Sequence, residues 1–467
     1  MTKKIYTDGD EGVQLIVREL GEKPVVAARS PVHVLYGGAH LYTAGITEKL
    51  GRLALESLES YAPNFVEFAR AMKLPDSGDL PRMLKAVTQL AAKIESSPAR
   101  AKEREPAAWL AWTIHQRTLA KLNSEPVEDF RIDFEDGYGF RSDAEEDGHA
   151  KAAASELANA LQFGRVTAFS GFRIKSFAKE TRERAIRTLE IFLDTFFLRT
   201  KGRLPDNFVV TLPKVTGRKQ IKQLCKLLTA HEKNAGIEKG SIGIEIMIET
   251  PEAIIDAKGR VPLRSFIEAA GSRSVSAHFG AYDYTSSLSI AAPFQDIRHP
   301  SCDFARQIMQ ASLAPLEIRV SDSVTTQLPV AVNRGEDLSE GQKNENHRSV
   351  HAGWRRHFEN VTHSMSSGFY QSWDVHPHQL PARYAAVYSF FLHNYEEQAR
   401  RLAGFVAKSM QASISGSMFD DAASAQGVLN FFRRALDCGA LTDDEVEKAT
   451  RMNAEQIKTM SFADLPG

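Results

Sequence analysis

Short apolar runs rich in β-branched residues recur along the chain, and each ends in glycine or polar residues. Runs of this length and composition predict buried strands. Amphipathic segments that predict helices separate most of the runs, for example ERAIRTLEIFLDTFF and KQIKQLCKLLTAHE. The predicted strands are Val32–Tyr36, Phe130–Phe134, Gly171–Ile174, Phe208–Leu212, Ser241–Ile248, Ser274–Phe279, Leu316–Val320 and Trp373–Val375.

Regular alternation of strands and helices predicts parallel pairing, and about eight such units close a barrel. We therefore predict an α/β fold of the (β/α)₈ TIM-barrel type. A doubly wound open sheet is the alternative, but no G-x-G-x-x-G phosphate motif follows the first strand. The pair Gly37-Gly38 at that position is more typical of a tight turn than of a phosphate site.

Three segments lie outside a minimal barrel. The segment from about 46 to 123 has a helical pattern and is inserted after the first strand, and the chain from 384 onward is helical again. The polar stretch 322–349 lacks periodicity and predicts a long loop, either a lid over the catalytic rim or a surface insertion. We expect one barrel domain over 1–383 and a helical extension over 384–467, with a capping box at Thr442–Glu445.

Composition narrows the class of protein. Of the 467 residues, 43% are hydrophobic, and 58 basic residues balance 59 acidic ones, so no global field favours nucleic acid or a membrane surface. Three scattered cysteines fit a reduced cytoplasm, and the N-terminus has no apolar leader. We expect a cytoplasmic enzyme whose helical insertion and extension offer contacts for a homo-oligomer.

Charged residues follow most of the predicted strands, where function collects in a parallel barrel. One such residue is usually a solvated strand end, but many on one rim would converge and require a compensating ion or ligand. The candidates are Glu135, Asp136, Arg173, Lys175, Lys214, Glu249, Asp283 and His376.

Glu249 and Asp283 are the candidate metal ligands. Two carboxylates from adjacent strands, completed by water and substrate oxygens, suit Mg²⁺, with Mn²⁺ as the alternative. No histidine pairs with cysteines at the spacing of a zinc site. Glu245 lies on the same strand face as Glu249 but deeper in the barrel, and we expect a structural partner for it.

Such a rim supports chemistry through an enolate. A magnesium ion polarises a carbonyl or carboxylate oxygen, and an adjacent arginine such as Arg173 stabilises the enolate oxygen that develops. A proton-transfer group on the other face of the substrate is still required.

At these residues the chain resembles the superfamily that contains the citrate lyase beta subunit, the HpcH/HpaI-type aldolases and malate synthase. The resemblance covers about residues 30 to 385, with the motifs in the family order. Those motifs are RIDFEDGYG, FRIK, LPKV, MIETPEAI, FGAYDYTSS and GFYQSWDVHPHQ.

The resemblance implies roles for individual residues. Glu249 and Asp283 would bind Mg²⁺, and Arg173 would hold the reacting oxygen of the substrate. Glu135 and Asp136 would act through metal-bound water or by orienting Arg173, and Lys214 would support the carboxylate side. Gly280 and His376 are expected substrate contacts.

Two departures from the family pattern matter. Lys175 replaces an Asn or a second Arg, so the catalytic cation is either Arg173 or Lys175. Gln371-Ser372 replaces the Gly-Lys before the last strand, which weakens any transfer of coenzyme A contacts.

The segment SMFDDAASAQ near the C-terminus resembles the malate synthase segment that carries the base for acetyl-CoA, and Asp421 is the matching residue. Asp420 and Asp421 could instead simply cap the helix that follows. Four histidines cluster in the sequence: His347, His351, His357 and His363. They are expected to be structural or exposed, because no acidic residue follows at the helical spacing that would complete a metal site.

The leading hypothesis is a Mg²⁺-dependent Claisen- or aldol-type enzyme acting on a small 2-oxo acid, with acetyl-CoA or another coenzyme A thioester as co-substrate in the malate-synthase-like version. The alternatives are an aldolase or lyase that releases pyruvate or acetyl-CoA, and a non-catalytic ligand-binding barrel.

Overall fold

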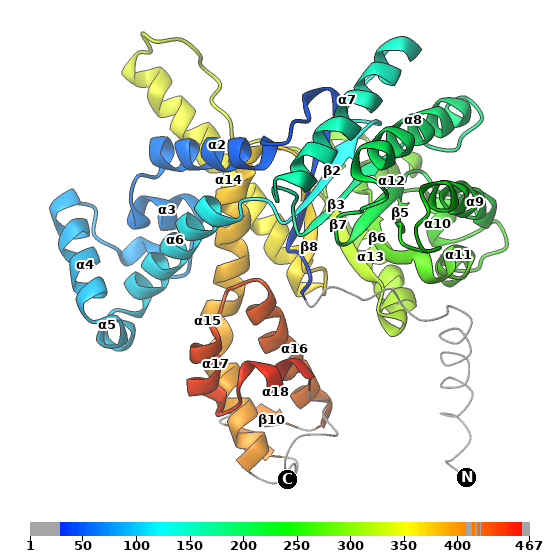
Figure 1. Cartoon of the computed structure of the whole chain (residues 1–467). Helices are drawn as coiled ribbons and strands as arrows, with labels where there is room; N and C mark the ends of the chain where they lie inside the picture. The colour runs from blue at the N-terminus through cyan, green and yellow to red at the C-terminus, as the bar shows by residue number, and fades with distance from the viewer. Residues whose placement is uncertain (1–28, 408–412, 416–417, 421, 460–467) are drawn as a thin grey trace, which may run out of the picture.

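The computed structural model describes residues 29–407, 413–415, 418–420 and 422–459. Eight parallel strands form a closed barrel in sequential order, which confirms the predicted (β/α)₈ fold (Figure 1). β1 pairs with both β2 and β8, and this double pairing closes the sheet. The strands are β1 (His33–Gly38), β2 (Asp129–Asp133), β3 (Phe169–Arg173), β4 (Phe208–Leu212), β5 (Gly243–Ile248), β6 (Ser274–Phe279), β7 (Arg319–Val324) and β8 (Gln371–Asp374).

Helices cover the outside of the barrel and bury their apolar faces against the strands. The ring of Phe192 on α8 stacks on Phe172 of β3 with 4.1 Å between centroids, and Phe196 stacks on Phe208 of β4. Apolar burial of this kind is the main stabilising term in such a shell. The covering helices are α7 (Asp143–Gln162), α8 (Arg182–Thr200), α9 (Arg218–Ala235), α10 (Pro251–Ile254), α11 (Leu263–Ala270), α12 (Ala281–Ser287), α13 (Pro300–Leu313), α14 (Glu340–Ser366) and α15 (Leu380–Ala407).

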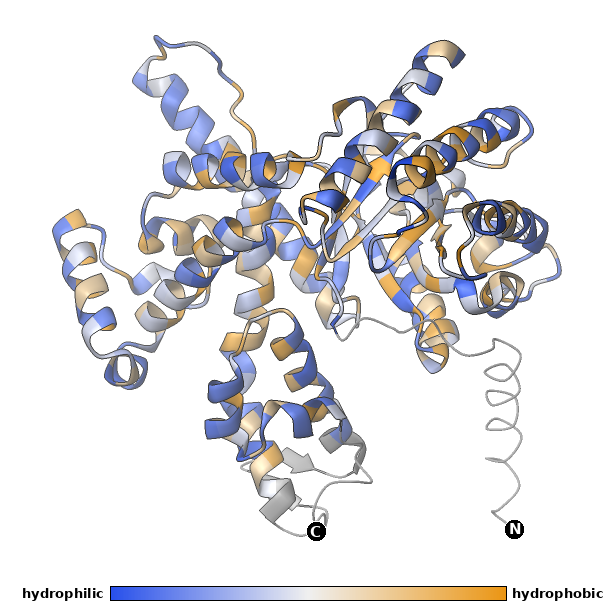
Figure 2. Ribbon diagram, viewed as in Figure 1, coloured by the Kyte–Doolittle hydropathy of each residue, from blue (hydrophilic) through white to orange (hydrophobic). Residues whose placement is uncertain are grey.

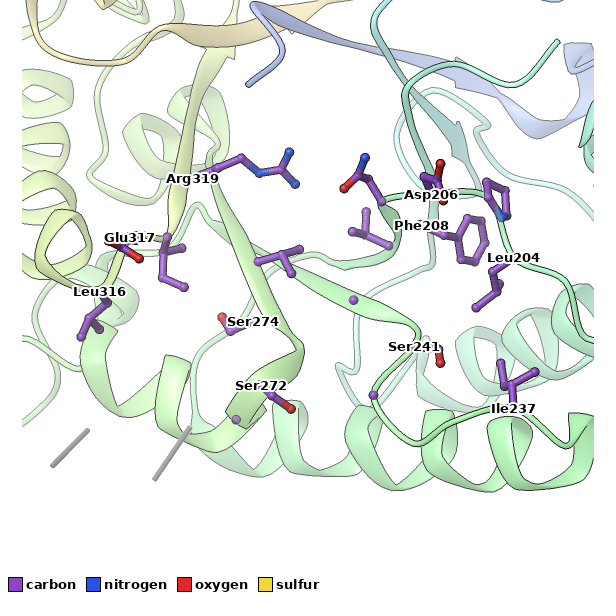
Figure 3. A pocket seen from close by; sticks show the side chains of 18 of the residues that line it. Leu204, Asp206, Phe208, Ile237, Ser241, Ser272, Ser274, Leu316, Glu317 and Arg319 are labelled. Carbon is purple, nitrogen blue, oxygen red and sulfur yellow. The ribbon is translucent and has the colours of Figure 1, made fainter. Parts of the chain in front are cut away.

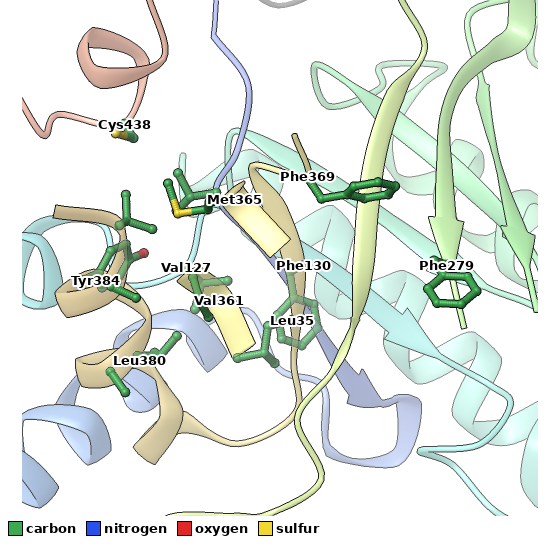
Figure 4. Packing of buried hydrophobic residues seen from close by; sticks show 14 of the residues in the cluster. Leu35, Val127, Phe130, Phe279, Val361, Met365, Phe369, Leu380, Tyr384 and Cys438 are labelled. Atoms are coloured by element: carbon green, nitrogen blue, oxygen red, sulfur yellow. The ribbon is translucent and has the colours of Figure 1, made fainter. Parts of the chain in front are cut away.

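The apolar layer continues beneath α14 and α15. Figure 4 shows Leu35 and Phe130 of the first two strands beside Val361 of α14. The Tyr384 hydroxyl of α15 donates a hydrogen bond to the Pro126 carbonyl, 3.0 Å away, so this ring is buried without losing its polar partner. Figure 2 shows that hydrophobic residues gather on the barrel strands and hydrophilic residues on the outer faces of the helices.

The insertion after β1 is helical, as the pattern predicts, and lies to one side of the barrel (Figure 1). Asn64 begins one of its helices by accepting hydrogen bonds from the backbone N–H groups of Val66 and Glu67. The insertion comprises α2 (Ile46–Tyr61), α3 (Phe65–Met72), α4 (Leu84–Ser96), α5 (Pro98–Arg104) and α6 (Pro106–Ser124).

The C-terminal region is helical as well and extends away from the barrel (Figure 1). Because α15 continues without a break from the barrel into this region, the division of the chain at 383/384 stays a prediction. The capping box at Thr442–Glu445 is present. The region also contains the short hairpin β9 (Ser413–Ser415) and β10 (Met418–Asp420), and the helices α16 (Ala422–Asp437), α17 (Asp443–Thr450) and α18 (Ala454–Thr459).

The boundaries of β7 and the start of α14 differ from the sequence prediction. β7 begins at Arg319 instead of Leu316, because Leu316 belongs to a 3₁₀ turn and Glu317 adopts a left-handed backbone. The prediction of a loop over 322–349 was wrong at both ends, because β7 continues to Val324 and α14 begins at Glu340. In the described part of the chain, no helix is long and apolar enough to cross a membrane.

Candidate functional site

The carboxyl ends of β2 to β6 bring together most of the charged residues that the sequence placed on the rim. Arg173 is the last residue of β3, and Glu135 and Asp136 follow β2. Lys214 lies two residues after β4, where it adopts a left-handed backbone with φ of 50°. The side chains of all four meet within ion-pair distance.

Arg173 is fully buried and held on several sides. Its Nε and Nη2 atoms donate to the two carboxylate oxygens of Asp133 at 2.7 and 2.6 Å. The rings of Tyr36 and Trp373 lie 4.9 and 5.2 Å from the guanidinium carbon, a cation–π arrangement on the barrel side. Because Asp133 fixes Nε and Nη2, the remaining nitrogen, Nη1, is the one directed at the rim.

Glu135 bridges the two cations of the rim. One of its oxygens lies 2.9 Å from Arg173 Nη1, and the other lies 2.5 Å from Lys214 Nζ. Burial raises the pKa of Glu135 to about 7, aided by the charge of Asp136 and opposed by the two cations. Near neutral pH this carboxyl group can therefore hold or release a proton.

Glu249 follows β5 directly and is only 1% exposed. Its Oε1 accepts the backbone N–H of Lys214 at 2.6 Å. The residue opposite has to be a glycine, because a Cβ on Gly280 would lie 2.6 Å from Glu249 Oε2. Gly280 therefore serves the site by leaving room for the carboxylate.

Asp283 lies beside Glu249, in the first turn of α12, and its side chain is 42% exposed. The two carboxyl groups share a hydrogen bond. Burial raises the pKa of Glu249 to about 8, and the charges of Glu135 and Asp283 add to this effect. Burial likewise raises the pKa of Asp283, against the opposing effect of Lys214.

These two carboxyl groups fit a divalent cation. No side-chain nitrogen of a lysine or arginine among the described residues lies within 4.0 Å of the Glu249 carboxylate, and the nearest to Asp283 is Lys214 Nζ, at 3.8 Å. A buried carboxylate without a cation is strongly disfavoured, so it binds either a proton or a metal ion. Because the described chain has no cluster of three or more His, Cys, Asp or Glu side chains suited to a metal, an ion here would depend on water or substrate for its other ligands.

Other candidates lie apart from this cluster. Lys175 turns away from the rim: its Nζ donates to Glu146 of α7 at 2.6 Å and to the Phe134 carbonyl at 2.8 Å. Lys175 and Arg173 therefore have different surroundings, because β3 ends at Arg173 and Lys175 lies beyond the strand. His376 caps a 3₁₀ turn by accepting the backbone N–H of His378, and burial lowers its pKa to about 4. Asp421 lies outside the described residues.

Below the rim, Glu245 has the structural partners expected of it. Arg131, Tyr36, Thr211 and Ser276 all donate hydrogen bonds to its carboxylate. Burial alone would raise the pKa of Glu245, but the charges of Arg131 and His278 and the hydrogen bonds from Ser276 and Thr211 together outweigh it, and the pKa falls to about 2.

Sequence reasoning missed Asp133, the main partner of Arg173. The period of two along DFRID places Asp129, Arg131 and Asp133 on the inner face of β2, which was the available signal. It also missed the aromatic support from Tyr36 and Trp373, which nothing local in the sequence indicates.

The clustered histidines make structural contacts on or near α14. His351 Nε2 lies 2.6 Å from the Tyr61 carbonyl, and His357 Nε2 lies 2.8 Å from Asp374. His363 Nε2 lies 2.8 Å from Asp303. The ring of His347 packs edge-on against Tyr61.

Comparison with solved structures places the fold among known barrels. A citrate lyase from Burkholderia xenovorans LB400 superposes with a TM-score of 0.51 at 20% identity, over 73% of this chain and 92% of that chain. At this identity the likeness shows the fold alone. A malate synthase from Haloferax volcanii, solved as a magnesium/glyoxylate complex, superposes with a TM-score of 0.39 at 18% identity, over 58% of this chain and 69% of that chain.

No curated protein sequence matches the chain. A family model does match residues 21–465, almost the whole length of the chain. The protein therefore belongs to the family described as the domain of unknown function DUF6986.

Proposed function

We propose that the protein is a divalent-metal-dependent enzyme that makes or breaks a carbon–carbon bond through an enolate, acting on a small 2-oxo acid. The observation that carries the proposal is the buried Glu249 carboxylate. It lies beside Asp283 without a cationic partner, on the same rim as the buried Arg173.

Glu249 and Asp283 would hold the ion, with Mg²⁺ preferred and Mn²⁺ as an alternative. When bound, such an ion polarises a carbonyl or carboxylate oxygen and lowers the energy of the neighbouring carbanion. Burial raises the pKa of both carboxyl groups, with neighbouring carboxylates adding to the effect, and this supports the role because a bound cation would favour their ionised forms.

Arg173 would stabilise the developing enolate oxygen through Nη1. Asp133 holds its other nitrogens, so the guanidinium needs little reorganisation when charge develops. Glu135 now lies 2.9 Å from Nη1, and we propose that an anionic substrate oxygen displaces it from this position. Lys214, 2.5 Å from Glu135 at the other end, would retain that carboxylate and support the carboxylate side of the substrate.

Glu135 is the group in the described site best suited to carry a proton, because its pKa lies near 7. In the malate-synthase-like version, Asp421 would instead remove a proton from acetyl-CoA. In the aldolase or lyase version, bond cleavage would release pyruvate or acetyl-CoA and require no base at Asp421.

Replacing Asp421 by Asn separates these versions. Turnover lost with metal binding intact supports the Claisen version, and unimpaired turnover removes it. Asp444→Asn, in the first turn of α17, is a matched control in the same C-terminal region.

The proposal as a whole is tested by measuring the binding and turnover of pyruvate, oxaloacetate, glyoxylate and acetyl-CoA with Mg²⁺ and with EDTA. We expect at least one 2-oxo acid to bind in a Mg²⁺-dependent manner, and Glu249→Gln to abolish that binding. Glu252→Gln, an exposed carboxylate three residues further on, is the matched control. Binding without turnover would favour the non-catalytic ligand-binding barrel, and activity unaffected by EDTA would overturn the metal mechanism.

A further inference from the structure

A cavity opens at the end of the barrel opposite the rim. It has a volume of about 440 Å³ and lies among the amino ends of β4, β5, β6 and β7 and the loops that lead into them (Figure 3). The rim residues Arg173 and Glu249 lie at the carboxyl ends of their strands, so the two sites are separated by the length of the barrel. A cavity of this size suits a small organic ligand.

Apolar side chains form much of the cavity wall. Leu204 and Phe208 contribute from the β4 side, Ile237 from the loop before β5, and Leu316 and Ile318 from the turn before β7. Figure 3 shows Ser274 and Ser272 between these two sides. Ser274 is 8% exposed, and its hydroxyl oxygen is buried without a hydrogen-bond partner.

Among the described residues that line this cavity, Arg319, the first residue of β7, is the only one with a cationic side chain (Figure 3). Its guanidinium stacks over the Phe169 ring at 4.6 Å, and burial lowers its pKa. Within the described chain, no carboxylate lies within 4.0 Å of it.

The other buried arginines near this end are paired. Arg131 forms ion pairs with Asp129 and Glu245, and Arg273 forms an ion pair with Glu232. A partly desolvated guanidinium without a carboxylate is costly, and an anionic ligand would compensate it. Asp206, an acidic residue of the cavity wall, is exposed and would disfavour a second negative charge on a ligand.

We propose that this cavity binds a small amphipathic monocarboxylate, whose carboxylate pairs with Arg319 and whose apolar body lies against Leu204, Phe208 and Ile237. The orphaned Ser274 hydroxyl supplies a further donor within the same cavity. The site is independent of the metal chemistry at the rim.

Octanoate is a suitable probe, and isothermal titration calorimetry of the full chain in EDTA tests the proposal without involving the rim. We expect octanoate to bind more tightly than octanol, octylamine or octanedioate, because only the monocarboxylate matches one cation in an apolar wall. Equal or tighter binding of octylamine or octanol would overturn the role of Arg319.

Two variants locate the site. Arg319→Gln should weaken octanoate binding at least tenfold, whereas Arg319→Lys should retain part of it and Arg203→Gln, an exposed arginine nearby, should leave it unchanged. Ser272→Trp, which fills the cavity without removing the charge, should also abolish binding and keeps the test valid if Arg319→Gln folds poorly. Wild-type affinity in Ser272→Trp, or in a folded Arg319→Gln, would refute the proposal, as would failure of octanoate to bind the wild-type protein.

Discussion

Asp133 and Arg173 form a two-point ion pair in which both residues are fully buried, with 2.7 and 2.6 Å between the paired atoms. The same carboxylate also accepts the backbone N–H groups of Glu135 and Gly137, at 3.0 and 2.7 Å. Asp133 thus ties Arg173, the last residue of β3, to the loop that carries Glu135. It acts as a positioning residue through Arg173.

Replacing Asp133 by Asn leaves the Arg173 charge buried without its main partner. We expect a loss of about 3–5 kcal/mol in the free energy of unfolding, the usual effect of breaking a buried pair. Urea denaturation measures this effect. Asp136→Asn is the comparison, because Asp136 is half-exposed and lies 3.4 Å from the same guanidinium, and its loss should cost about 1 kcal/mol or less. Equal effects in the two variants would show that Asp133 is not the main partner.

Replacing Arg173 and replacing Lys175 should have different effects on binding, because the two side chains have different surroundings. Lys175→Met removes the ion pair with Glu146 and should lower stability while leaving the affinity for the 2-oxo acid within about twofold. Arg173→Met should abolish that affinity. Calorimetric titration of both variants in Mg²⁺ checks this difference. A comparable loss of binding in Lys175→Met would show that Lys175 contributes to substrate binding.

Glu245 supports the barrel interior through its ion pair with Arg131. We expect Glu245→Gln to lower the free energy of unfolding by about 3–5 kcal/mol at pH 7 without changing metal affinity. Because the pKa of Glu245 in the fold, about 2, lies below its value in the unfolded chain, this contribution is present above about pH 4.3 and is lost as the pH falls towards 2. Denaturation curves at pH 7, 4 and 3 should show the variant and the wild type converging, and a constant difference would contradict the assignment.

In the metal-free protein, the contribution of Glu249 to stability should depend on pH in the opposite direction to that of Glu245. Its pKa of about 8 in the fold exceeds its unfolded value, so its contribution to stability is greatest below about pH 4.3 and is lost as the pH rises to 8. In EDTA, Glu249→Gln should therefore be more stable than the wild type at pH 8.5, by on the order of 2–4 kcal/mol, and nearly equal to it at pH 4.5. Thermal or urea unfolding measures this difference. Glu252→Gln should show no such trend, and a destabilised Glu249→Gln at pH 8.5 would contradict the account.

The hydrophobic pattern predicted the barrel because most strands bury an apolar outer face under helices, and seven of the eight predicted strands overlap with the observed ones. β7 was misplaced because its sequence, RVSDSV, is polar: Asp322, in the middle of the strand, forms a buried ion pair with Arg306 of α13. The start of α14 was missed because its first turns are polar, although the Ser339–Gln342 capping box was readable.

Much of the rim was predictable because parallel strands end on one face, which placed Glu135, Arg173, Lys214 and Glu249 together. The surroundings of Lys175 were not predictable from the family pattern, because β3 ends at Arg173 and Lys175 lies beyond it. The direction of a side chain beyond a strand depends on the turn that follows and on distant partners, here Glu146 on α7. The cavity beside Arg319 was not predicted at all, since four separate loops assemble it.

Electron paramagnetic resonance of Mn²⁺ titrated into the protein tests the central claim most directly, because it reports the bound ion without requiring the substrate. The account predicts one Mn²⁺ site in the wild type and in Glu252→Gln, displaced by Mg²⁺, and a loss of at least tenfold in affinity in Glu249→Gln and Asp283→Asn. Unchanged Mn²⁺ affinity in both of these variants, with the fold intact, would contradict it.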